Sequence, residues 1–120
     1  MPNPILVVED NKDLSLLFRL SLESAGYQVK TVDNGNDALK HIDAIQPQLV
    51  LLDIMMPEIS GLEVARKIKQ RENYECLPIL LTSALDRLQD DRLHESQADG
   101  ILYKPFDIDE LIQRVDSLIA

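Results

Sequence analysis

A run of four apolar residues, Leu49 to Leu52, leads directly into Asp53, and Pro57 follows four residues later. A short apolar run bounded by a breaker is typical of a strand that is buried on both faces. An aspartate at the end of such a strand is costly to bury unless it is paired or coordinated. Open parallel sheets bind ligands at the carboxyl ends of their strands, so Asp53 is a candidate for chemistry. A loop aspartate that caps the next element is the alternative at this point.

The rest of the chain alternates between short β-rich runs and segments whose apolar residues recur at helical spacing. The expected strands cover residues 5–8, 27–32, 49–53, 79–83 and 98–103. Alternation of this kind predicts an α/β fold, in which parallel strands are joined by right-handed crossovers and helices cover both faces of the sheet. We expect residues 1–120 to form one domain, because a chain of 120 residues leaves no room for a second.

Five helices are expected between and after these strands. Capping signals stand at Asn11, at the S-x-x-E box of Ser60 and at Asp107, while Asn34-Gly35 has the form of a turn. The segment 86–95 has helical propensity but is weakly amphipathic. The apolar stripe expected for the first helix consists of Leu14, Leu17, Phe18, Leu22 and Ala25.

Charge and cysteine content limit the possible functions and compartments. The formal net charge of −9 argues against a non-specific nucleic-acid or anionic membrane surface. The single cysteine, Cys76, excludes a disulfide framework and is consistent with a reducing compartment. Neither a signal peptide nor a transmembrane segment is evident at the sequence level. We therefore expect a cytoplasmic protein.

Polar residues stand at the carboxyl ends of four expected strands. They are Glu9 with Asp10, then Asp53, Thr82 with Ser83, and Lys104. In a parallel sheet these ends share one edge, so three carboxylates would lie together and repel one another unless a hard cation relieves the repulsion. All-oxygen ligands favour Mg²⁺ or Mn²⁺. A lysine and a threonine hydroxyl suit the oxygens of a transferring phosphoryl group.

Together these residues resemble the receiver domain of two-component response regulators. The resemblance spans essentially the whole chain and rests on five features in order: Glu9-Asp10, the stretch from Leu51 to Pro57, Gly61, Thr82 and Lys104-Pro105-Phe106. It implies a flavodoxin-like (βα)5 doubly wound sheet with strand order 2-1-3-4-5. It also implies a phosphorylation-activated switch. Such a domain catalyses its own phosphorylation and dephosphorylation but is not a conventional turnover enzyme.

The resemblance assigns a role to each matching position. Asp53 would accept a phosphoryl group from a histidine kinase or a histidine phosphotransfer protein. Mg²⁺ (or Mn²⁺) would be bound by Asp10, Asp53 and the main-chain carbonyl of Met55, and by Glu9 mainly through water. Phosphorylation would then change the binding face for a downstream protein effector or a fused output domain, without direct nucleic-acid or membrane binding.

The remaining site roles fall on the last two strands. Lys104 would pair with Asp53 at rest and with a phosphoryl oxygen afterwards. Thr82 would bond another phosphoryl oxygen, and the small Ser83 would leave the phosphorus approachable. The Lys104-Pro105 bond is expected to be cis. Apolar Met55 and Ala84, each two residues beyond a site residue, do not position water, so slow self-hydrolysis is expected.

One position departs from the family pattern. Many receivers carry Tyr or Phe three residues before the lysine, where this chain has Ile101. Strand alternation places Tyr103 on the same side as Ile101. We therefore hypothesise that the switch signals through backbone shifts of residues 83–95.

Other functions on a similar fold remain for comparison. A phosphorylation-independent protein-interaction module is the alternative, and only Ile101 supports it. An FMN carrier would need a glycine- and hydroxyl-rich loop where Glu9 to Asp13 is acidic. A haloacid-dehalogenase-type phosphatase would need a second aspartate where Met55 stands. The sequence leaves open whether the receiver is free-standing or part of a longer regulator.

Overall fold

Five parallel strands form one sheet in the order β2-β1-β3-β4-β5. The computed structural model describes residues 3–84 and 90–119. The strands are β1 (Ile5–Val8), β2 (Val29–Val32), β3 (Leu49–Asp53), β4 (Ile79–Ser83) and β5 (Gly100–Tyr103). The helices are α1 (Lys12–Ser24), α2 (Gly35–Ile45), α3 (Gly61–Lys69), α4 (Asp90–Ser96) and α5 (Ile108–Ile119). The predicted fold class and strand order are confirmed.

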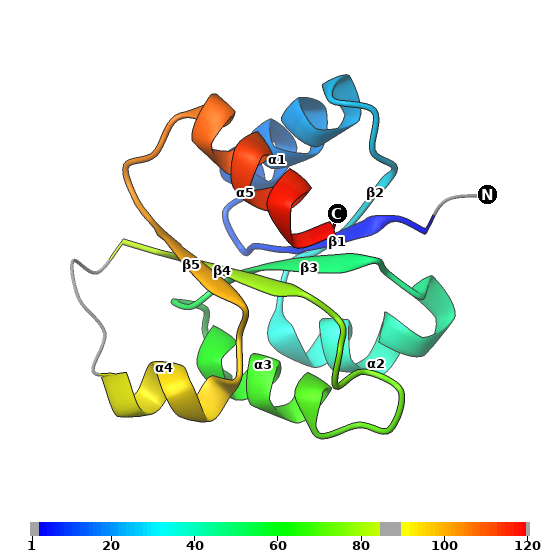
Figure 1. Cartoon of the computed structure of the whole chain (residues 1–120), viewed down its shortest axis with the longest axis vertical. Helices are drawn as coiled ribbons and strands as arrows, with labels where there is room; N and C mark the ends of the chain where they lie inside the picture. The colour runs from blue at the N-terminus through cyan, green and yellow to red at the C-terminus, as the bar shows by residue number, and fades with distance from the viewer. Residues whose placement is uncertain (1–2, 85–89, 120) are drawn as a thin grey trace.

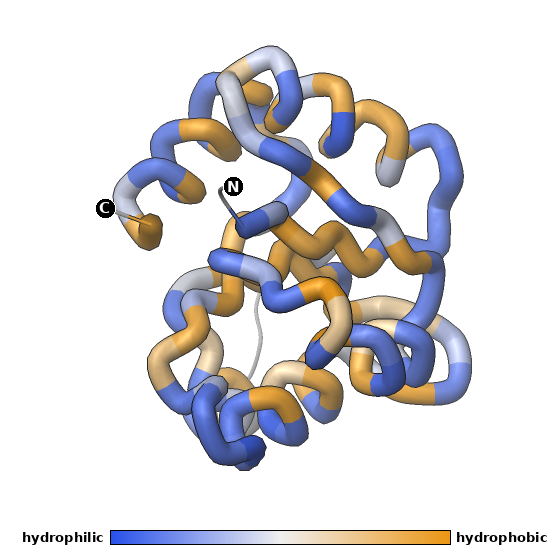
Figure 2. The backbone as a smooth tube through the Cα atoms, turned by 90° about the vertical axis from the view of Figure 1, so that its right-hand side faces the viewer, coloured by the Kyte–Doolittle hydropathy of each residue, from blue (hydrophilic) through white to orange (hydrophobic). Residues whose placement is uncertain are grey.

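The sheet lies between two layers of helices, with α1 and α5 on one face and α2, α3 and α4 on the other (Figure 1). Alternate residues of each central strand enter opposite cores: Ile5 and Leu51 face the α1–α5 layer, whereas Leu6 and Leu52 face the α2–α3–α4 layer. Both faces of β1, β3 and β4 are buried. This explains why their sequences are continuously apolar, as the hydropathy of the central strands in Figure 2 illustrates.

The helix starts follow the capping chemistry, with two corrections. The Asn11 side chain accepts a hydrogen bond from the Leu14 N–H, and that of Asp107 accepts one from the Glu110 N–H, as expected. Asn34 does not form a free turn with Gly35, because its side chain accepts from the Asp37 N–H and caps α2.

Ser60 caps α3 through the Leu62 N–H, but the reciprocal half of the predicted capping box is not formed. The Glu63 carboxylate instead pairs with Arg66 one turn later. The buried stripe predicted for α1 is also wrong in part, because Leu17 is 47% exposed and Ala25 is exposed at the end of the helix. The stripe is narrower than predicted because Phe18 and Leu22 fill the contact with the sheet.

Two expected strands are shorter than the sequence indicated: β5 begins at Gly100 rather than at Ala98, and β2 is also shortened. β2 begins at Val29 rather than at Tyr27, and it is an edge strand. Of the expected helix 86–95, the part from Asp90 onward belongs to α4, and residues 86–89 lie outside the described residues. Within the described ranges, no helix is long and apolar enough to cross a membrane.

Candidate functional site at the carboxyl edge of the sheet

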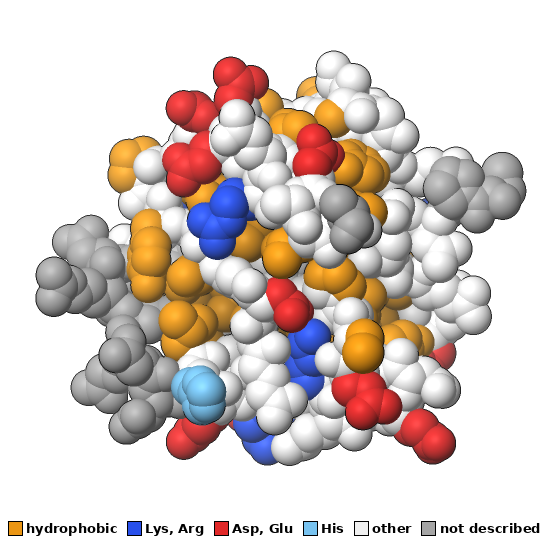
Figure 3. All heavy atoms as spheres, viewed as in Figure 1, with side chains coloured by type: hydrophobic (Ala, Val, Ile, Leu, Met, Phe, Trp, Pro, Cys, Tyr) orange, Lys and Arg blue, Asp and Glu red, His pale blue; other side chains and the backbone are white. Residues whose placement is uncertain are grey.

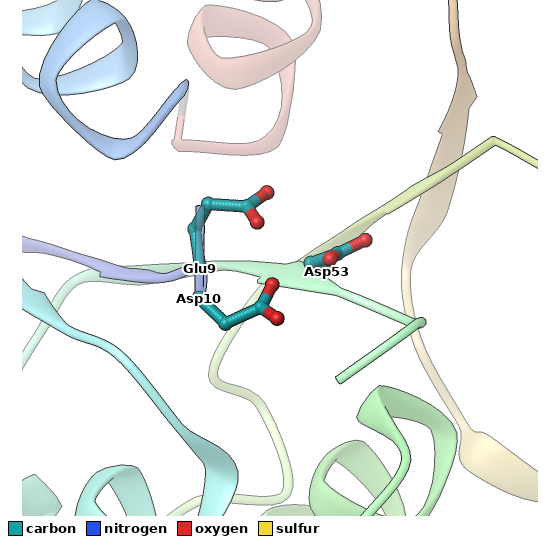
Figure 4. Close-up of side chains that lie close together, drawn as sticks. All are labelled: Glu9, Asp10 and Asp53. Carbon is teal, nitrogen blue, oxygen red and sulfur yellow. The ribbon is translucent and has the colours of Figure 1, made fainter. Parts of the chain in front are cut away.

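Three carboxylates converge where β1 and β3 end. Each of Glu9, Asp10 and Asp53 offers one oxygen, and these oxygens lie within 4.8 Å of one another. Their carboxyl groups all point into the space beyond the strand ends (Figure 4). Glu9 and Asp53 are 3% and 4% exposed, whereas Asp10 is open to solvent.

Strand register produces this arrangement. Val8 of β1 pairs with Leu52 of β3. Glu9 directly follows Val8 and Asp53 directly follows Leu52, so the two carboxylates lie side by side. The same register sets Asp53 opposite Thr82 of β4. The residue after β5, Lys104, donates its backbone N–H to the Ser83 carbonyl at 2.7 Å. Four strands therefore deliver site residues to one edge, as the strand-end pattern predicted.

Lys104 neutralises part of the acidic cluster. Its Nζ lies 3.6 Å from Asp53 Oδ1 and 3.8 Å from Glu9 Oε1. Both distances exceed an ordinary hydrogen bond, so each contact is an ion pair with little directional bonding. The expected resting partnership of Lys104 with Asp53 is present in this geometry. The Lys104-Pro105 peptide bond is cis, as expected.

Burial shifts the titration of both inner carboxyls. It raises the pKa of Glu9 to about 7, and the charge of Asp53 acts in the same direction, while the Asn11 N–H and Lys104 oppose it. Burial likewise raises the pKa of Asp53 above its usual value, against the opposing effects of Lys104 and the Met55 N–H. The protein alone therefore does not fully stabilise two ionised carboxylates at this edge.

The donor set fits a hard divalent cation. Glu9 Oε2 accepts the Asn11 N–H at 3.1 Å, but the buried Glu9 Oε1 has no hydrogen-bond partner among the described residues. Glu9 and Asp53, whose pKa values are raised, converge with the Asp10 carboxylate, and Mg²⁺ or Mn²⁺ would relieve the repulsion between such groups. The Met55 N–H lies 3.4 Å from Asp53 Oδ1, while its side chain is 56% exposed. Ligation by the Met55 carbonyl stays a prediction.

Thr82 places an unused hydroxyl beside the acceptor candidate. Its side chain is fully buried, and within the described part of the chain Oγ1 has no hydrogen-bond partner. Because the hydroxyl has no partner among the described residues, it can bond an incoming oxygen without breaking an existing hydrogen bond. Leaving a buried hydroxyl without a partner is unfavourable, and such a bond would remove that cost. Ser83, also buried, is the small neighbour that the sequence indicated.

Gly61 has a steric role that sequence reasoning did not identify. A Cβ at this position would lie 2.1 Å from the Asp53 carbonyl oxygen and 2.8 Å from Ile54 Cα. The Gly61 N–H also donates to the Ile54 carbonyl at 2.9 Å. The start of α3 thus rests directly on the end of β3. A glycine immediately after the Ser60 cap was the only sequence signal of this close approach.

The face around β5 lacks a free aromatic at the expected position. Ile101 is half-buried and packs on the α2–α3–α4 core, whereas Tyr103 is 37% exposed. The Arg114 guanidinium of α5 donates to the Ile101 carbonyl at 3.0 Å. Hydrophobic side chains surface over β5 in Figure 3, with acidic groups above them over α5. The proposed movement of residues 83–95 involves residues 85–89, which lie outside the described residues.

Sequence comparison identifies the family. A model of the response regulator receiver domain matches residues 5–116. The polar-differentiation response regulator DivK of Brucella anthropi is 31% identical over 121 residues, covering 100% of this chain and 98% of DivK. The DNA-binding dual master transcriptional regulator RpaA of Synechocystis is 34% identical over 116 residues, covering 96% of this chain but 48% of RpaA. The chain spans about half the length of the first curated relatives it matches.

Solved structures share the whole fold. The response regulator TrrA of Thermotoga maritima, in complex with Mg²⁺-BeF, has a TM-score of 0.87 and 38% identity, covering 97% of this chain and 98% of that one. The receiver domain of the sensor histidine kinase PA1611 of Pseudomonas aeruginosa, with magnesium coordinated in its active site cleft, has a TM-score of 0.87 and 30% identity, covering 99% of this chain and 98% of that one. The chain therefore belongs to the response regulator receiver domains, the phosphorylation-activated switches of two-component signalling.

Proposed function

We propose that Asp53 is the phosphoryl acceptor of this receiver and that residues 1–120 form a single receiver domain. An Asp53 Oδ would attack the phosphorus of a donor phosphohistidine. The Oδ–P bond forms as the N–P bond breaks, and the released imidazole takes up a proton. The observation that carries the proposal is the meeting of buried Asp53, Lys104 and the Thr82 hydroxyl, which has no hydrogen-bond partner among the described residues, at one sheet edge.

A divalent cation would be held by Glu9, Asp10 and Asp53, with the Met55 carbonyl as a further ligand. When bound, Mg²⁺ or Mn²⁺ would screen the repulsion between the anionic acceptor and an anionic phosphoryl group. Asp10 and Asp53 present carboxylate oxygens directly, and we assign Glu9 an outer position through water. The buried Glu9 Oε1, which accepts no hydrogen bond from the described residues, supports its participation.

Lys104 and Thr82 would recognise the transferred group. The Lys104 Nζ lies 3.6 Å from Asp53 Oδ1 and, after transfer, would pair with a phosphoryl oxygen instead. The Thr82 hydroxyl would donate to another, which would draw the end of β4 inward. Because phosphorylation adds about two negative charges, it can bias a two-state loop and change the partner face. The domain would thereby catalyse its own phosphorylation and dephosphorylation.

The outer face of α1 is our candidate docking surface for the phosphoryl donor. Leu16, Leu17 and Leu20 are each about half exposed on this helix, which begins just after Glu9 and Asp10. A groove of about 520 Å³ runs from Glu9 past Leu16 toward α2. A histidine kinase or histidine phosphotransfer protein could bury these leucines while presenting its imidazole to Asp53. A downstream effector or a fused output domain would read the result, in the cytoplasm.

Intact mass after incubation with Mg²⁺ and acetyl phosphate tests this function. Wild type is expected to gain one phosphoryl group, and both Asp53→Asn and a chelated wild-type sample are expected to gain none. Failure of wild type to gain the group, together with failure to bind Mg²⁺, would overturn the proposal. That result would favour a phosphorylation-independent interaction module.

A further inference from the structure

A stacked aromatic pair joins α1 to the segment after β5, and neither ring has a role in the function proposed above. The rings of Phe18 on α1 and Phe106 have centroids 6.0 Å apart and planes 9° apart. Phe18 is 1% exposed, and Phe106 packs half-buried on the α1–α5 core. Figure 1 shows the connection between β5 and α5 rising from the sheet edge into this helical layer. Stacked rings of this kind stabilise a fold beyond the contribution of the apolar area that they bury.

Helix α1 supports both partners of one ion pair. At its N-terminal end, the Asn11 backbone N–H donates to Glu9 Oε2 at 3.1 Å. Two turns later Phe18 holds Phe106, which stands two residues after Lys104. The Lys104 Nζ then lies 3.8 Å from Glu9 Oε1. Helix α1 therefore contacts both charged parts of the site: the acidic part through Glu9, and the segment that carries Lys104 through Phe106.

Lys104 has few other restraints. Its backbone N–H is fixed by the Ser83 carbonyl, but its side chain is 26% exposed and makes only the two long ion pairs among described residues. No hydrogen bond to a described residue holds the ammonium, so how far the side chain can reach toward Asp53 depends on where the Lys104 backbone lies. A shift of the segment that carries Phe106 would thus move the charge relative to Asp53.

We propose that Phe106, seated on Phe18, is a positioning residue that sets Lys104 for phosphoryl transfer. The inference rests on the proposed function, since it assigns the lysine its role there. Misplacement of a catalytic group by about 1 Å can cost up to about 100-fold in rate. Loss of one ring of the pair removes the support but leaves Lys104 itself, so a smaller effect of about tenfold is expected.

The test is a double-mutant cycle between Phe106→Ala and Lys104→Ala. The rate of phosphorylation by saturating acetyl phosphate with Mg²⁺ is followed by intact mass, and cooperative thermal unfolding shows that each variant is folded. Phe106→Ala should slow the wild-type reaction about tenfold yet leave the Lys104→Ala rate unchanged. Phe106→Leu keeps an apolar side chain against Phe18 and should retain most of the wild-type rate. It takes the place of Phe106→Ala in the comparison if Phe106→Ala folds poorly. Ile108→Ala, in the same core without the stack, serves as the matched control.

Mg²⁺ affinity gives a readout that does not depend on phosphoryl transfer. Lys104 repels a cation at the carboxylates, so Lys104→Ala and Phe106→Ala should each tighten Mg²⁺ binding, and the double variant no more than Lys104→Ala alone. The inference would be overturned if Phe106→Ala slowed the reaction equally in wild type and in Lys104→Ala, or if Phe106→Ala left the Mg²⁺ affinity unchanged. If wild type is not phosphorylated but both variants still bind Mg²⁺ more tightly, the proposed function is rejected and the positioning of Lys104 by Phe106 is not.

Discussion

Glu9 concentrates the electrostatic cost of the site in one side chain. Its pKa is raised from 4.5 to about 7 by burial first and by Asp53 second. The folded protein therefore keeps a proton on Glu9 that the unfolded chain releases near pH 4.5. The stability linked to this proton is complete below pH 4.5 and is lost as the pH rises to about 7. Asp53, whose pKa is also raised, contributes with the same sign.

The Glu9→Gln variant measures this cost. In metal-free protein, the free energy of unfolding of wild type should fall by about 3 kcal/mol between pH 4.5 and pH 7.5, and Glu9→Gln should flatten much of that slope. Urea unfolding at a series of pH values is the measurement. Glu72→Gln, at an exposed carboxylate away from the site, should keep the wild-type slope. A Glu9→Gln profile that parallels wild type would contradict the assigned cause.

Two buried hydroxyls of this protein predict opposite mutational effects. The Thr82 hydroxyl has no partner among described residues, so Thr82→Val should stabilise the unphosphorylated protein by about 1 kcal/mol. The Ser96 hydroxyl donates to the Leu93 carbonyl at 2.6 Å and accepts from the Ala98 N–H at 3.2 Å. Ser96→Ala should therefore destabilise by about 1 kcal/mol. Chemical denaturation compares them, and a destabilised Thr82→Val would show that its hydroxyl is already satisfied.

At the scale of elements, the contact between the end of β3 and the start of α3 depends on Gly61. A methyl group there would meet backbone atoms of Asp53 and Ile54, which cannot turn aside. Gly61→Ala should cost about 3 kcal/mol or more in free energy of unfolding. Gly26→Ala is the control, because its φ of 101° is strained for alanine but no atom that the structure describes beyond the chain neighbours lies within 4 Å of the new Cβ.

Torsional strain alone should make Gly26→Ala cost about 1–2 kcal/mol. Thermal or urea unfolding of the two variants separates steric from torsional cost. Equal losses for both glycines would mean that β3 and α3 can separate without penalty. The comparison therefore tests how tightly the acceptor strand is joined to the helix after it.

The exposed leucines of α1 predict a defect that is specific to protein donors. Leu16→Gln and Leu20→Gln should each slow transfer from a phosphorylated histidine protein about tenfold, because each removes apolar area from the docking face. Phosphorylation by acetyl phosphate, which needs no docking, should be unchanged. Ala44→Gln, at an exposed position on α2 in the opposite layer, is the control. Equal slowing with both donors would place the defect in the site itself.

At the scale of the whole molecule, the sequence predicted architecture better than detail. Strand order and the convergence on Asp53 follow from continuous apolar strands and the polar residue at each strand end. The exposure of Leu17 did not follow, because helical spacing cannot tell how wide a stripe the sheet covers. The close approach at Gly61 and the Phe18–Phe106 stack depend on tertiary packing between distant segments, which periodicity does not report. Asn34 was misread because one Asn-Gly pair serves either a turn or a helix cap.

The most direct test of the central claim is to identify the phosphorylated residue. Phosphorylated protein would be treated with sodium borohydride, which reduces an acyl phosphate to an alcohol, and then digested and sequenced by mass spectrometry. We expect homoserine at position 53 in wild type, dependent on Mg²⁺ and on the phosphoryl donor, and no modified residue in Asp53→Asn. Conversion at another carboxylate, with Asp53 recovered unchanged, would contradict the assignment of Asp53 as the acceptor.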